Sequence, residues 1–252
     1  MIDLSGRVAL VTGASAGIGV QVARAFGAAE AAVVVHARRE EARVGDVMAA
    51  IAAAGGRAVL ATGDLADEAA CAEVVEQAVR TFGRLDVLVN NAGVQPVQAL
   101  DTMTLADWRA VVDVNLGATF ACTQSAARQM RGTGGGSIIH IASIEGSQPA
   151  YGHAHYAASK AAIIMHARAA ALEYGSFGIR VNTVSPGLIT RPGLEEDWPE
   201  GVGRWLAAAP LGRLGTGMDV ANACLFLASP MAAWITRHNL VVDGGMSAHP
   251  AW

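Results

Sequence analysis

Short, largely apolar segments alternate along this chain with longer segments whose apolar residues recur at a helical period, and this alternation limits the possible folds more than any other feature. The apolar segments are residues 8–11, 33–35, 58–60, 87–89, 137–141, 179–184 and 240–242. Apolar runs that do not alternate with polar residues are typical of strands in a parallel sheet covered on both faces. With right-handed crossovers, the pattern predicts a doubly wound α/β fold of about seven strands with helices on both faces.

Length and composition predict a single domain that spans residues 1–252. Of the 252 residues, 52% are hydrophobic and 16% are charged, and no segment has the composition of a linker. No apolar run approaches the roughly 20 residues of a membrane span, and the N-terminus lacks the pattern of a secretory signal. Cys71, Cys122 and Cys224 are widely spaced, so neither a disulfide framework nor a metal site is predicted. We therefore expect a cytoplasmic protein that does not bind membranes.

The charge of the chain bears on its partners. The formal net charge is −4, and no cluster of basic residues exceeds the pair Arg38 and Arg39. Nucleic-acid binders normally present a basic face. We therefore expect no nucleic-acid partner.

A glycine-rich turn follows the first predicted strand. Residues 12–19 read Thr-Gly-Ala-Ser-Ala-Gly-Ile-Gly, and a helix is expected from about residue 17 to residue 29. Glycines allow the backbone to approach a pyrophosphate, and the unpaired N–H groups of the helix N-terminus can bind it. The spacing is Gly-x-x-x-Gly-x-Gly, so a phosphate site is favoured, although a tight turn without a ligand would fit the same residues.

Tyr156 and Lys160 are four residues apart in a segment with helical character, so their side chains lie on the same helix face. A nearby ammonium group stabilises a phenolate and lowers the pKa of the tyrosine. The pair is therefore a candidate proton donor. The alternative is a tyrosine and a lysine stacked on a solvent-exposed helix face.

Together these two motifs resemble those of the short-chain dehydrogenase/reductase family, and the resemblance covers nearly the whole chain. Further motifs occur in the order of the family: Asp64 after the third predicted strand, Asn90-Asn91-Ala92-Gly93 after the fourth, Asn115 in a long helix, Ser143 after the fifth strand and Pro186-Gly187 after the sixth. The resemblance implies a single NAD(P)-binding, Rossmann-like oxidoreductase domain. It also implies a mobile substrate lid at about residues 189–211.

The resemblance implies a set of residues around a nicotinamide dinucleotide. They are Gly13, Ser15, Ala16, Gly17, Ile18, Gly19, Arg38, Arg39, Asp64, Leu65, Asn91, Ala92, Gly93, Tyr156, Lys160, Pro186, Gly187, Ile189 and Thr190. Asp64 could instead be a helix N-cap, and Asn91 could be an amide that stabilises a turn. Relatives often carry the threonine one residue later, where this chain has Arg191.

The end of the second predicted strand bears on the choice of cofactor. By the family pattern, Ala37 stands where NAD-binding relatives carry an acid, and Arg38 follows with a guanidinium that could bind a 2′-phosphate. NADP(H) is therefore favoured, and NAD(H) is possible. Two points weigh against this choice: Ala16 stands where NADP-binding relatives often have a basic residue, and Arg38 and Arg39 could form a solvated helix start.

The catalytic residues implied by the resemblance are Asn115, Ser143, Tyr156 and Lys160. Tyr156 would move the oxygen-bound proton as a hydride moves to or from a carbonyl carbon, and Ser143 would hold the substrate oxygen. Lys160 would lower the pKa of Tyr156 and bind the nicotinamide ribose. Asn115 would bend its helix and hold a water that links Lys160 to solvent. Taken singly, Ser143 could be a turn serine and Asn115 a core amide.

The substrate residues implied are Ser143, Glu145, Gln148, Tyr156 and Trp198, although the lid aromatics could equally pack on the core or on a neighbouring subunit. The favoured function is a carbonyl reductase or secondary alcohol dehydrogenase acting on a small-molecule ketone or alcohol. A 3-oxoacyl-thioester reductase is an alternative, with Arg128 and Arg131 as scattered candidates for carrier binding. A dinucleotide sensor without catalysis is another.

Relatives pair the helices that carry Asn115 and Tyr156, so the resemblance implies a homotetramer or a homodimer. Glu30 and Arg237 replace glycines that are usual in the family, and we expect these departures to affect turns rather than chemistry.

Overall fold

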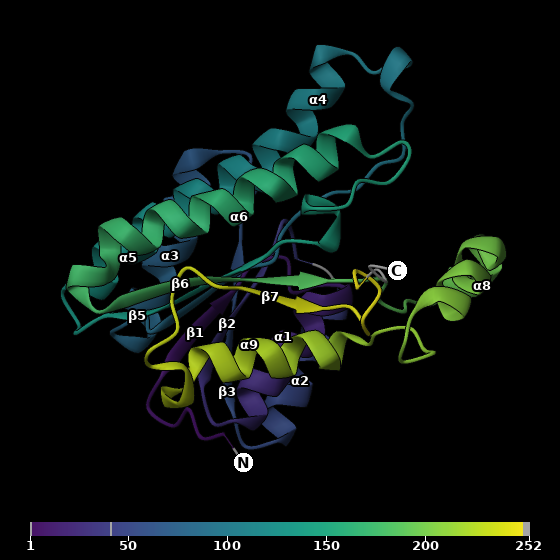
Figure 1. The fold of residues 1–252 in the computed structure, drawn as a ribbon. Helices are drawn as coiled ribbons and strands as arrows, with labels where there is room; N and C mark the ends of the chain where they lie inside the picture. The colour runs from purple at the N-terminus through teal and green to yellow at the C-terminus, as the bar shows by residue number, and fades with distance from the viewer. Residues whose placement is uncertain (1, 41, 249–252) are drawn as a thin grey trace.

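The computed structural model describes residues 2–40 and 42–248, and in this part of the chain seven parallel strands form one sheet (Figure 1). The strands are β1 (Val8–Val11), β2 (Ala32–Ala37), β3 (Arg57–Thr62), β4 (Val87–Asn90), β5 (Gly136–Ile141), β6 (Ile179–Pro186) and β7 (Asn239–Val242). Their order across the sheet is β3-β2-β1-β4-β5-β6-β7. The chain therefore reverses its direction across the sheet after β3, and the predicted doubly wound fold is confirmed.

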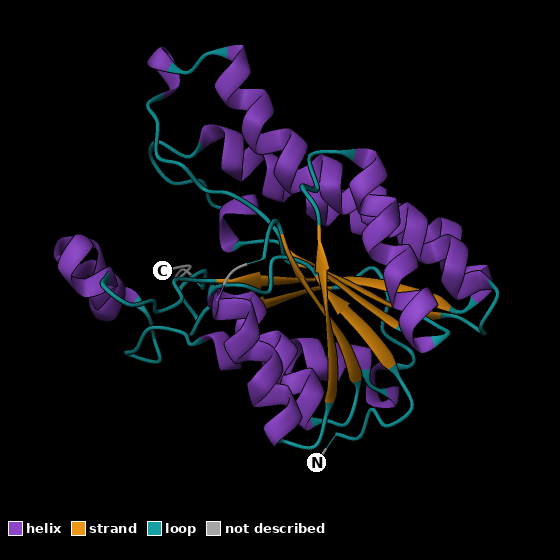
Figure 2. Cartoon of the chain, turned by 180° about the vertical axis from the view of Figure 1, so that it is seen from behind, coloured by secondary structure: helices purple, strands orange, loops and turns teal. Residues whose placement is uncertain are grey.

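Helices cover both faces of this sheet, as Figure 2 shows from behind. They are α1 (Gly17–Ala28), α2 (Ala42–Ala53), α3 (Glu68–Phe82), α4 (Leu105–Val112), α5 (Ala118–Arg131), α6 (Ala154–Tyr174), α7 (Leu194–Asp197), α8 (Pro199–Ala208) and α9 (Gly217–Ala228). Shorter helical segments are η1 (Leu100–Thr102), the π-helical η2 (Asp113–Gly117), η3 (Ile144–Gly146), η4 (Gly175–Phe177) and η5 (Pro230–Ala232). Helices α1, α2 and α9 pack on one face, and α3, α5 and α6 pack on the other.

Strand β2 illustrates why the predicted strands are apolar throughout. All six of its residues are buried. Val33 and Val35 pack into the core beneath α1, α2 and α9, whereas Ala32 and Val34 pack into the core beneath α3 and α5. Because successive side chains of a strand point to opposite faces, a strand between two helical layers is apolar on both faces. The exception in β2 is His36, whose ring nitrogens are hydrogen-bonded to Gly13 and Gly63.

The carboxyl ends of the parallel strands lie along one edge of the sheet, where the loops that carry the candidate site residues begin. Helices α7 and α8 stand apart from the two helical layers beyond β6 and β7 (Figures 1 and 2). Among the described residues, no helix combines the length and the hydropathy needed to cross a bilayer.

Candidate active site

The glycine-rich turn between β1 and α1 has a conformation and a packing that require glycine. Gly13 and Gly17 have φ angles of 63° and 54°, which other residues adopt at a cost. A Cβ atom on Gly19 would lie 2.4 Å from the carbonyl oxygen of Gly13, so only glycine fits there. The N-cap Ala16 provides no side-chain hydrogen bond to α1, which leaves the first amides of the helix available to a ligand. The N-terminus of α1 is therefore open to an anionic ligand, and Ser15 and Ile18 in this turn are half-buried.

A hydrogen-bond network joins this turn to the loop after β4. The Thr12 hydroxyl oxygen accepts hydrogen bonds from the backbone N–H groups of Asn91 (2.9 Å) and Ala92 (3.0 Å). The Asn91 side-chain amide donates to the carbonyl oxygens of Thr12 (2.9 Å) and Gly13 (3.0 Å). Asn91 thus stabilises the turn, which is compatible with a place beside the cofactor. The network holds the ends of β1 and β4 together at the point where the sheet changes direction.

His36 is a functional candidate that sequence reasoning missed. It is 2% exposed, and its Nδ1 accepts a hydrogen bond from the Gly13 N–H at 3.1 Å. Its Nε2 therefore carries the proton and donates to the Gly63 carbonyl oxygen at 3.0 Å. Burial lowers the pKa of His36, partly opposed by the bond to Gly63. The acceptor role of Nδ1 requires a neutral ring. The available signal was one histidine at the end of an apolar strand, but its partners could not be foreseen.

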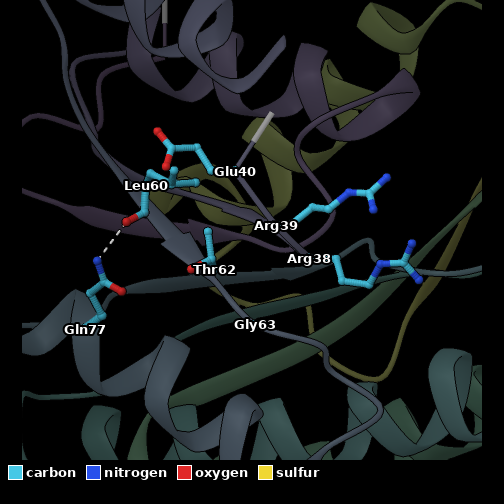
Figure 3. Close-up of a pocket in the computed structure, with 7 residues that line it drawn as sticks. All are labelled: Arg38, Arg39, Glu40, Leu60, Thr62, Gly63 and Gln77. Carbon is cyan, nitrogen blue, oxygen red and sulfur yellow. Dashed lines mark hydrogen bonds between the residues drawn. The ribbon is translucent and has the colours of Figure 1, made fainter. Parts of the chain in front are cut away.

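Arg38 and Arg39 follow β2 and line an open pocket of about 470 Å³. The pocket is also lined by Glu40, Leu60, Thr62, Gly63 and Gln77. Figure 3 shows both arginine side chains extending in one direction and the Glu40 carboxylate pointing away from them. Ala37, at the end of β2, is buried and leaves this corner without an acid at the strand end.

Asp64 and Leu65 follow β3 directly after the pocket residues Thr62 and Gly63. The Asp64 carboxylate accepts a hydrogen bond from the Ala66 N–H at 3.1 Å, and the residue is exposed. The N-cap of α3 is Asp67, which accepts from the Ala69 N–H at 3.0 Å. The alternative interpretation of Asp64 as a helix N-cap is therefore wrong. Leu65 is buried, with 6% of its surface exposed.

Ser143, Tyr156 and Lys160 come together beyond the end of β5. Ser143 is the N-cap of η3, and Tyr156 and Lys160 lie in the first turns of α6. The Lys160 Nζ donates a hydrogen bond to the Ile141 carbonyl oxygen at 2.7 Å and lies 5.4 Å from the centroid of the Tyr156 ring. The Ser143 side chain lies close enough to the Tyr156 hydroxyl to lower the pKa of that phenol. The phenol, the serine hydroxyl and the ammonium therefore occupy one small volume.

The pKa of Tyr156 differs from the sequence-based expectation. Burial raises it to about 12, the Ser143 side chain acts in the opposite direction, and the charge of Glu145 raises it further. Burial also lowers the pKa of Lys160 to about 8. We expected Lys160 to lower the pKa of Tyr156. In the structure its ammonium binds a backbone carbonyl over the ring face, and removal from water dominates the pKa of both groups.

Asn115 lies at the π-helical segment η2 between α4 and α5, which is the local irregularity predicted for its helix. Its side chain is fully buried. The Oδ1 atom accepts from the Val94 N–H at 2.8 Å, and Nδ2 donates to the Ser159 hydroxyl at 3.1 Å. A Cβ on Gly93 would lie 3.0 Å from Oδ1 and 3.8 Å from the Lys160 Nζ. Asn115 thus links the loop after β4 to the helix turn that carries Lys160.

The segment after β6 forms the far side of the site. Pro186 is the last residue of β6, and the Gly187 N–H donates to the Val242 carbonyl oxygen at 3.0 Å. A Cβ on Gly187 would lie 2.6 Å from the indole ring of Trp205 in α8. Ile189 pairs with Gly215, and the Thr190 N–H donates to the Gly215 carbonyl oxygen at 2.8 Å.

Arg191 stands where relatives often carry the threonine. It forms an ion pair with Asp197 of α7 at 2.7 Å. In this chain the position therefore ties the start of the segment 189–211 to its own first helix.

Two of the predicted substrate residues have contacts that bear on their roles. Trp198 is 47% exposed and packs over Gly201, where a Cβ would meet its indole ring at 1.9 Å. The Gln148 amide donates to the Ser247 carbonyl oxygen at 3.4 Å and so contacts the turn after β7. Trp205, not Trp198, is the lid aromatic that lies against Gly187.

Glu145 is the third predicted substrate residue outside the catalytic group. Its backbone N–H donates to the Ser143 hydroxyl oxygen at 3.1 Å. Its carboxylate bonds to Gln95 and to His153, each at 2.9 Å. The structure therefore brings Glu145 to the Ser143 and Tyr156 corner of the site.

A doubly wound parallel sheet with a glycine-rich turn at its switch point, next to a serine, tyrosine and lysine cluster, is typical of a dinucleotide-dependent oxidoreductase. A family model described as enoyl-(acyl carrier protein) reductase matches residues 13–247. A 2,5-dichloro-2,5-cyclohexadiene-1,4-diol dehydrogenase of Sphingobium indicum is 38% identical over 244 residues, which cover 97% of each chain.

A second relative and a solved structure are also similar to this chain over nearly its whole length. A 3-oxoacyl-[acyl-carrier-protein] reductase of Synechocystis is 39% identical over 98% of this chain and 99% of its own. A 7α-hydroxysteroid dehydrogenase solved with NADH and 7-oxo glycochenodeoxycholic acid is 36% identical, with a TM-score of 0.92 over 97% of this chain and 95% of its own. The chain belongs to the short-chain dehydrogenase/reductase family and is an oxidoreductase acting on hydroxyl or carbonyl groups.

Proposed function

We propose that this protein is an NADP(H)-dependent carbonyl reductase or secondary alcohol dehydrogenase with a single domain over residues 1–252. The observation that carries the proposal is the meeting of Ser143, Tyr156 and Lys160, supported by Asn115, beside a glycine-rich turn whose helix N-terminus is open to an anionic ligand. These groups come from η3, α6 and η2, and a structural role for any one of them would not require the others. A cofactor sensor without catalysis would not need this set.

In the proposed mechanism, the chain holds the cofactor through the glycine turn, the loop of residues 91–93 and the segment of residues 186–190. When bound, the nicotinamide supplies the hydride for reduction or accepts it in oxidation. Ser143 donates a hydrogen bond to the substrate oxygen and orients the carbonyl group. Tyr156 gives its hydroxyl proton to that oxygen as the carbon accepts the hydride, so the ketone becomes a secondary alcohol. Lys160, whose ammonium binds the Ile141 carbonyl oxygen beside the Tyr156 ring, would also hold the nicotinamide ribose.

The pocket beside Arg38 and Arg39 supports NADP(H). Two guanidinium groups next to the end of β2, with the buried Ala37 in place of an acid, suit a phosphate better than a ribose hydroxyl. NAD(H) remains the alternative cofactor, and it is the one bound by the hydroxysteroid dehydrogenase. The ratio of kcat/KM for NADPH over NADH measures this choice, and a ratio below one would contradict it.

The proposed substrate is a ring ketone or ring alcohol, with residues 189–211 as the lid. The Sphingobium relative is named for a cyclohexadienediol, and the hydroxysteroid dehydrogenase was solved with a steroid acid, so both names specify six-membered carbocycles. The indole of Trp205 beside Gly187 would give such a ring an apolar contact. Buried free thiols at Cys71, Cys122 and Cys224 support a cytoplasmic location.

A 3-oxoacyl-thioester reductase is the second candidate, and the Synechocystis relative carries that name. Carrier recognition would need basic residues near the site. Arg128 and Arg131 lie in the last turn of α5, just before the strand β5 begins, and therefore at the edge of the sheet opposite the site. Arg131 also stacks on Phe177 at 4.0 Å. The position of these arginines therefore favours a ring ketone over a carrier-bound 3-oxoacyl thioester as the substrate.

The test measures the oxidation of NADPH, through its loss of absorbance, in the presence of cyclohexanones, steroid ketones or a 3-oxoacyl thioester. The same assays are repeated with NADH. We expect turnover of ring ketones and a loss of at least about 10³-fold in kcat for Tyr156→Phe, because the proton donor is removed. Binding of NADPH, measured by fluorescence titration, should change little in that variant. Tyr156→Phe turnover equal to that of the unaltered enzyme would refute the mechanism.

A further inference from the structure

Three polar side chains from separate segments meet beside Tyr156: Gln95 from the loop after β4, Glu145 from η3 and His153 from the start of α6. The Gln95 amide donates to the Glu145 Oε1 at 2.9 Å, and the His153 Nδ1 lies 2.9 Å from the Glu145 Oε2. The Gln95 amide also lies 3.5 Å from the His153 Nδ1. The three side chains form one cluster centred on the Glu145 carboxylate.

This cluster faces the reacting end of the site. The Glu145 N–H donates to the hydroxyl oxygen of Ser143, and the His153 ring is edge-on to the Tyr156 ring, with 6.0 Å between centroids. The carboxylate is also close enough to Tyr156 for its charge to raise the pKa of that hydroxyl, after the larger effect of burial. A substrate held by Ser143 and Tyr156 would therefore have the cluster as a neighbour.

The Glu145 carboxylate keeps hydrogen-bonding capacity. Each of its oxygens accepts one hydrogen bond from the cluster, whereas a carboxylate offers about four acceptor sites. The side chains of Glu145 and His153 are each 16% exposed, so the pair is partly removed from water yet still reachable. A substrate hydroxyl could donate to an oxygen that is otherwise poorly hydrated, and such a bond is stronger than one between neutral groups.

The charge of the cluster sets which groups it accepts. Among the ion pairs formed by the described residues, the partner of Glu145 is His153, and no lysine or arginine is joined to the carboxylate. The Glu145 carboxylate is the negatively charged group of the cluster. A hydrogen-bond donor would be attracted, whereas a substrate carboxylate would be repelled in a partly desolvated site.

We propose that Gln95, Glu145 and His153 form a subsite that selects ring ketones and alcohols carrying a second hydroxyl group and rejects those carrying a carboxylate. This inference rests on the proposed function, because it assigns the substrate class to the same site. Glu145 is the specificity-determining residue, and Gln95 and His153 hold its carboxylate in place.

The test compares kcat/KM for cyclohexanone, 3-hydroxycyclohexanone, 4-hydroxycyclohexanone, 4-oxocyclohexanecarboxylate and the methyl ester of that acid. In the unaltered enzyme, the better hydroxyketone should exceed cyclohexanone by about tenfold, and the carboxylate should fall below its ester by about tenfold. In Glu145→Gln both ratios should fall below about threefold, because the amide has a similar shape but no charge. In this variant kcat/KM should therefore fall for the hydroxyketone and rise for the carboxylate, each relative to its reference ketone. General damage to the site would not produce opposite changes.

Two further variants separate the effect of the Glu145 charge from the effect of a disturbed cluster. His153→Asn keeps the carboxylate, so discrimination against 4-oxocyclohexanecarboxylate should persist. Glu76→Gln removes an equally charged but exposed side chain from α3 and should leave both ratios unchanged.

The outcomes distinguish this inference from the proposed function. The subsite alone is overturned if turnover depends on Tyr156 but the enzyme does not discriminate by the hydroxyl or carboxylate group of the ketone. It is also overturned if that discrimination is unchanged in Glu145→Gln. Failure to reduce any of the five ketones with either cofactor overturns both proposals for ring ketones.

Discussion

His140 occupies the middle of the sheet on β5 and is fully buried. Its Nδ1 accepts a hydrogen bond from the Asn90 amide at 3.1 Å, and its Nε2 lies 3.3 Å from the His166 Nδ1. Burial, with smaller contributions from the charges of His166 and Lys160, lowers the pKa of His140 to about 3. The residue is therefore neutral in the folded protein at any ordinary pH, and its ring belongs to a hydrogen-bonded chain across the core.

We expect this histidine to make the protein sensitive to acid. The pKa of His140 is about 3 in the folded chain and about 6.5 in the unfolded chain. Between these values the unfolded chain binds the proton and the folded chain does not, so the free energy of unfolding falls as the pH falls from about 6.5 to about 3. At pH 5 the loss from this residue is about 2 kcal/mol.

Urea unfolding at pH 7.5, 6 and 5 measures this loss. His140→Gln should be less stable at neutral pH but should lose about 2 kcal/mol less on going to pH 5. His238→Gln, at an exposed position, serves as the control and should keep the full pH dependence. An unchanged slope in His140→Gln would contradict the assignment.

The hydrogen-bond partners of the buried histidines could not be predicted from the sequence. His36 directly follows a predicted apolar strand, and His140 lies within another. Nothing local shows that His36 accepts from Gly13 and donates to Gly63, because these partners lie in the loops after β1 and β3. The pKa of Tyr156 could not be predicted for the same reason. The sequence gives the spacing from Tyr156 to Lys160, but it does not give the burial that raises this pKa.

At the scale of elements, two turns use residues other than glycine in the left-handed conformation. Glu30 has a φ of 68° and Arg237 a φ of 62°. Glu30 follows α1, where its N–H donates to the Gly27 carbonyl and the Ala31 N–H donates to the Phe26 carbonyl. This is a Schellman motif, in which glycine is normally favoured at the position of Glu30. The predicted effect of these departures on turns is confirmed.

We expect Glu30→Gly and Arg237→Gly each to stabilise the protein by about 0.5–1 kcal/mol. The left-handed conformation costs a non-glycine residue about 1–2 kcal/mol, and the greater freedom of glycine in the unfolded chain offsets part of that gain. Both positions are exposed, so no packing is lost. Thermal unfolding monitored by circular dichroism gives the change.

Gly83→Ala is the matched control for these substitutions. Gly83 follows α3 with a φ of 81°, and a Cβ there would meet no atom within 4 Å. Its replacement should destabilise the protein by a similar amount through conformation alone. If Glu30→Gly lowered the melting temperature, side-chain interactions of Glu30 would outweigh the backbone cost.

At the scale of the whole molecule, the outer surface of α5 and α6 exposes large apolar side chains. Phe120 is 50% exposed, Met165 59% and Leu172 71%. Isolated exposed apolar residues are ordinary, but these lie on the two helices for which the family resemblance predicts pairing between subunits, and the alanines of α6 allow close approach. We therefore predict a homotetramer, or a homodimer, with this surface at an interface.

Light scattering at micromolar concentration measures the assembly. The double substitution Phe120→Lys with Met165→Lys should reduce the molar mass at least twofold, because two buried cations would face each other across the interface. Ala53→Lys, exposed on α2 in the opposite helical layer, should leave the molar mass unchanged. A monomer for the unaltered protein would rule out the interface.

The sequence by itself determined the strands, the glycine turn and the positions of the catalytic candidates, because apolar periodicity and glycine requirements are properties of short segments. Tertiary structure alone decided that Trp205 rather than Trp198 covers Gly187, that Arg191 binds Asp197, and that Gln95, Glu145 and His153 meet beside Tyr156. These features depend on distances between segments and on burial. Both arise only when the sheet and its two helical layers pack together.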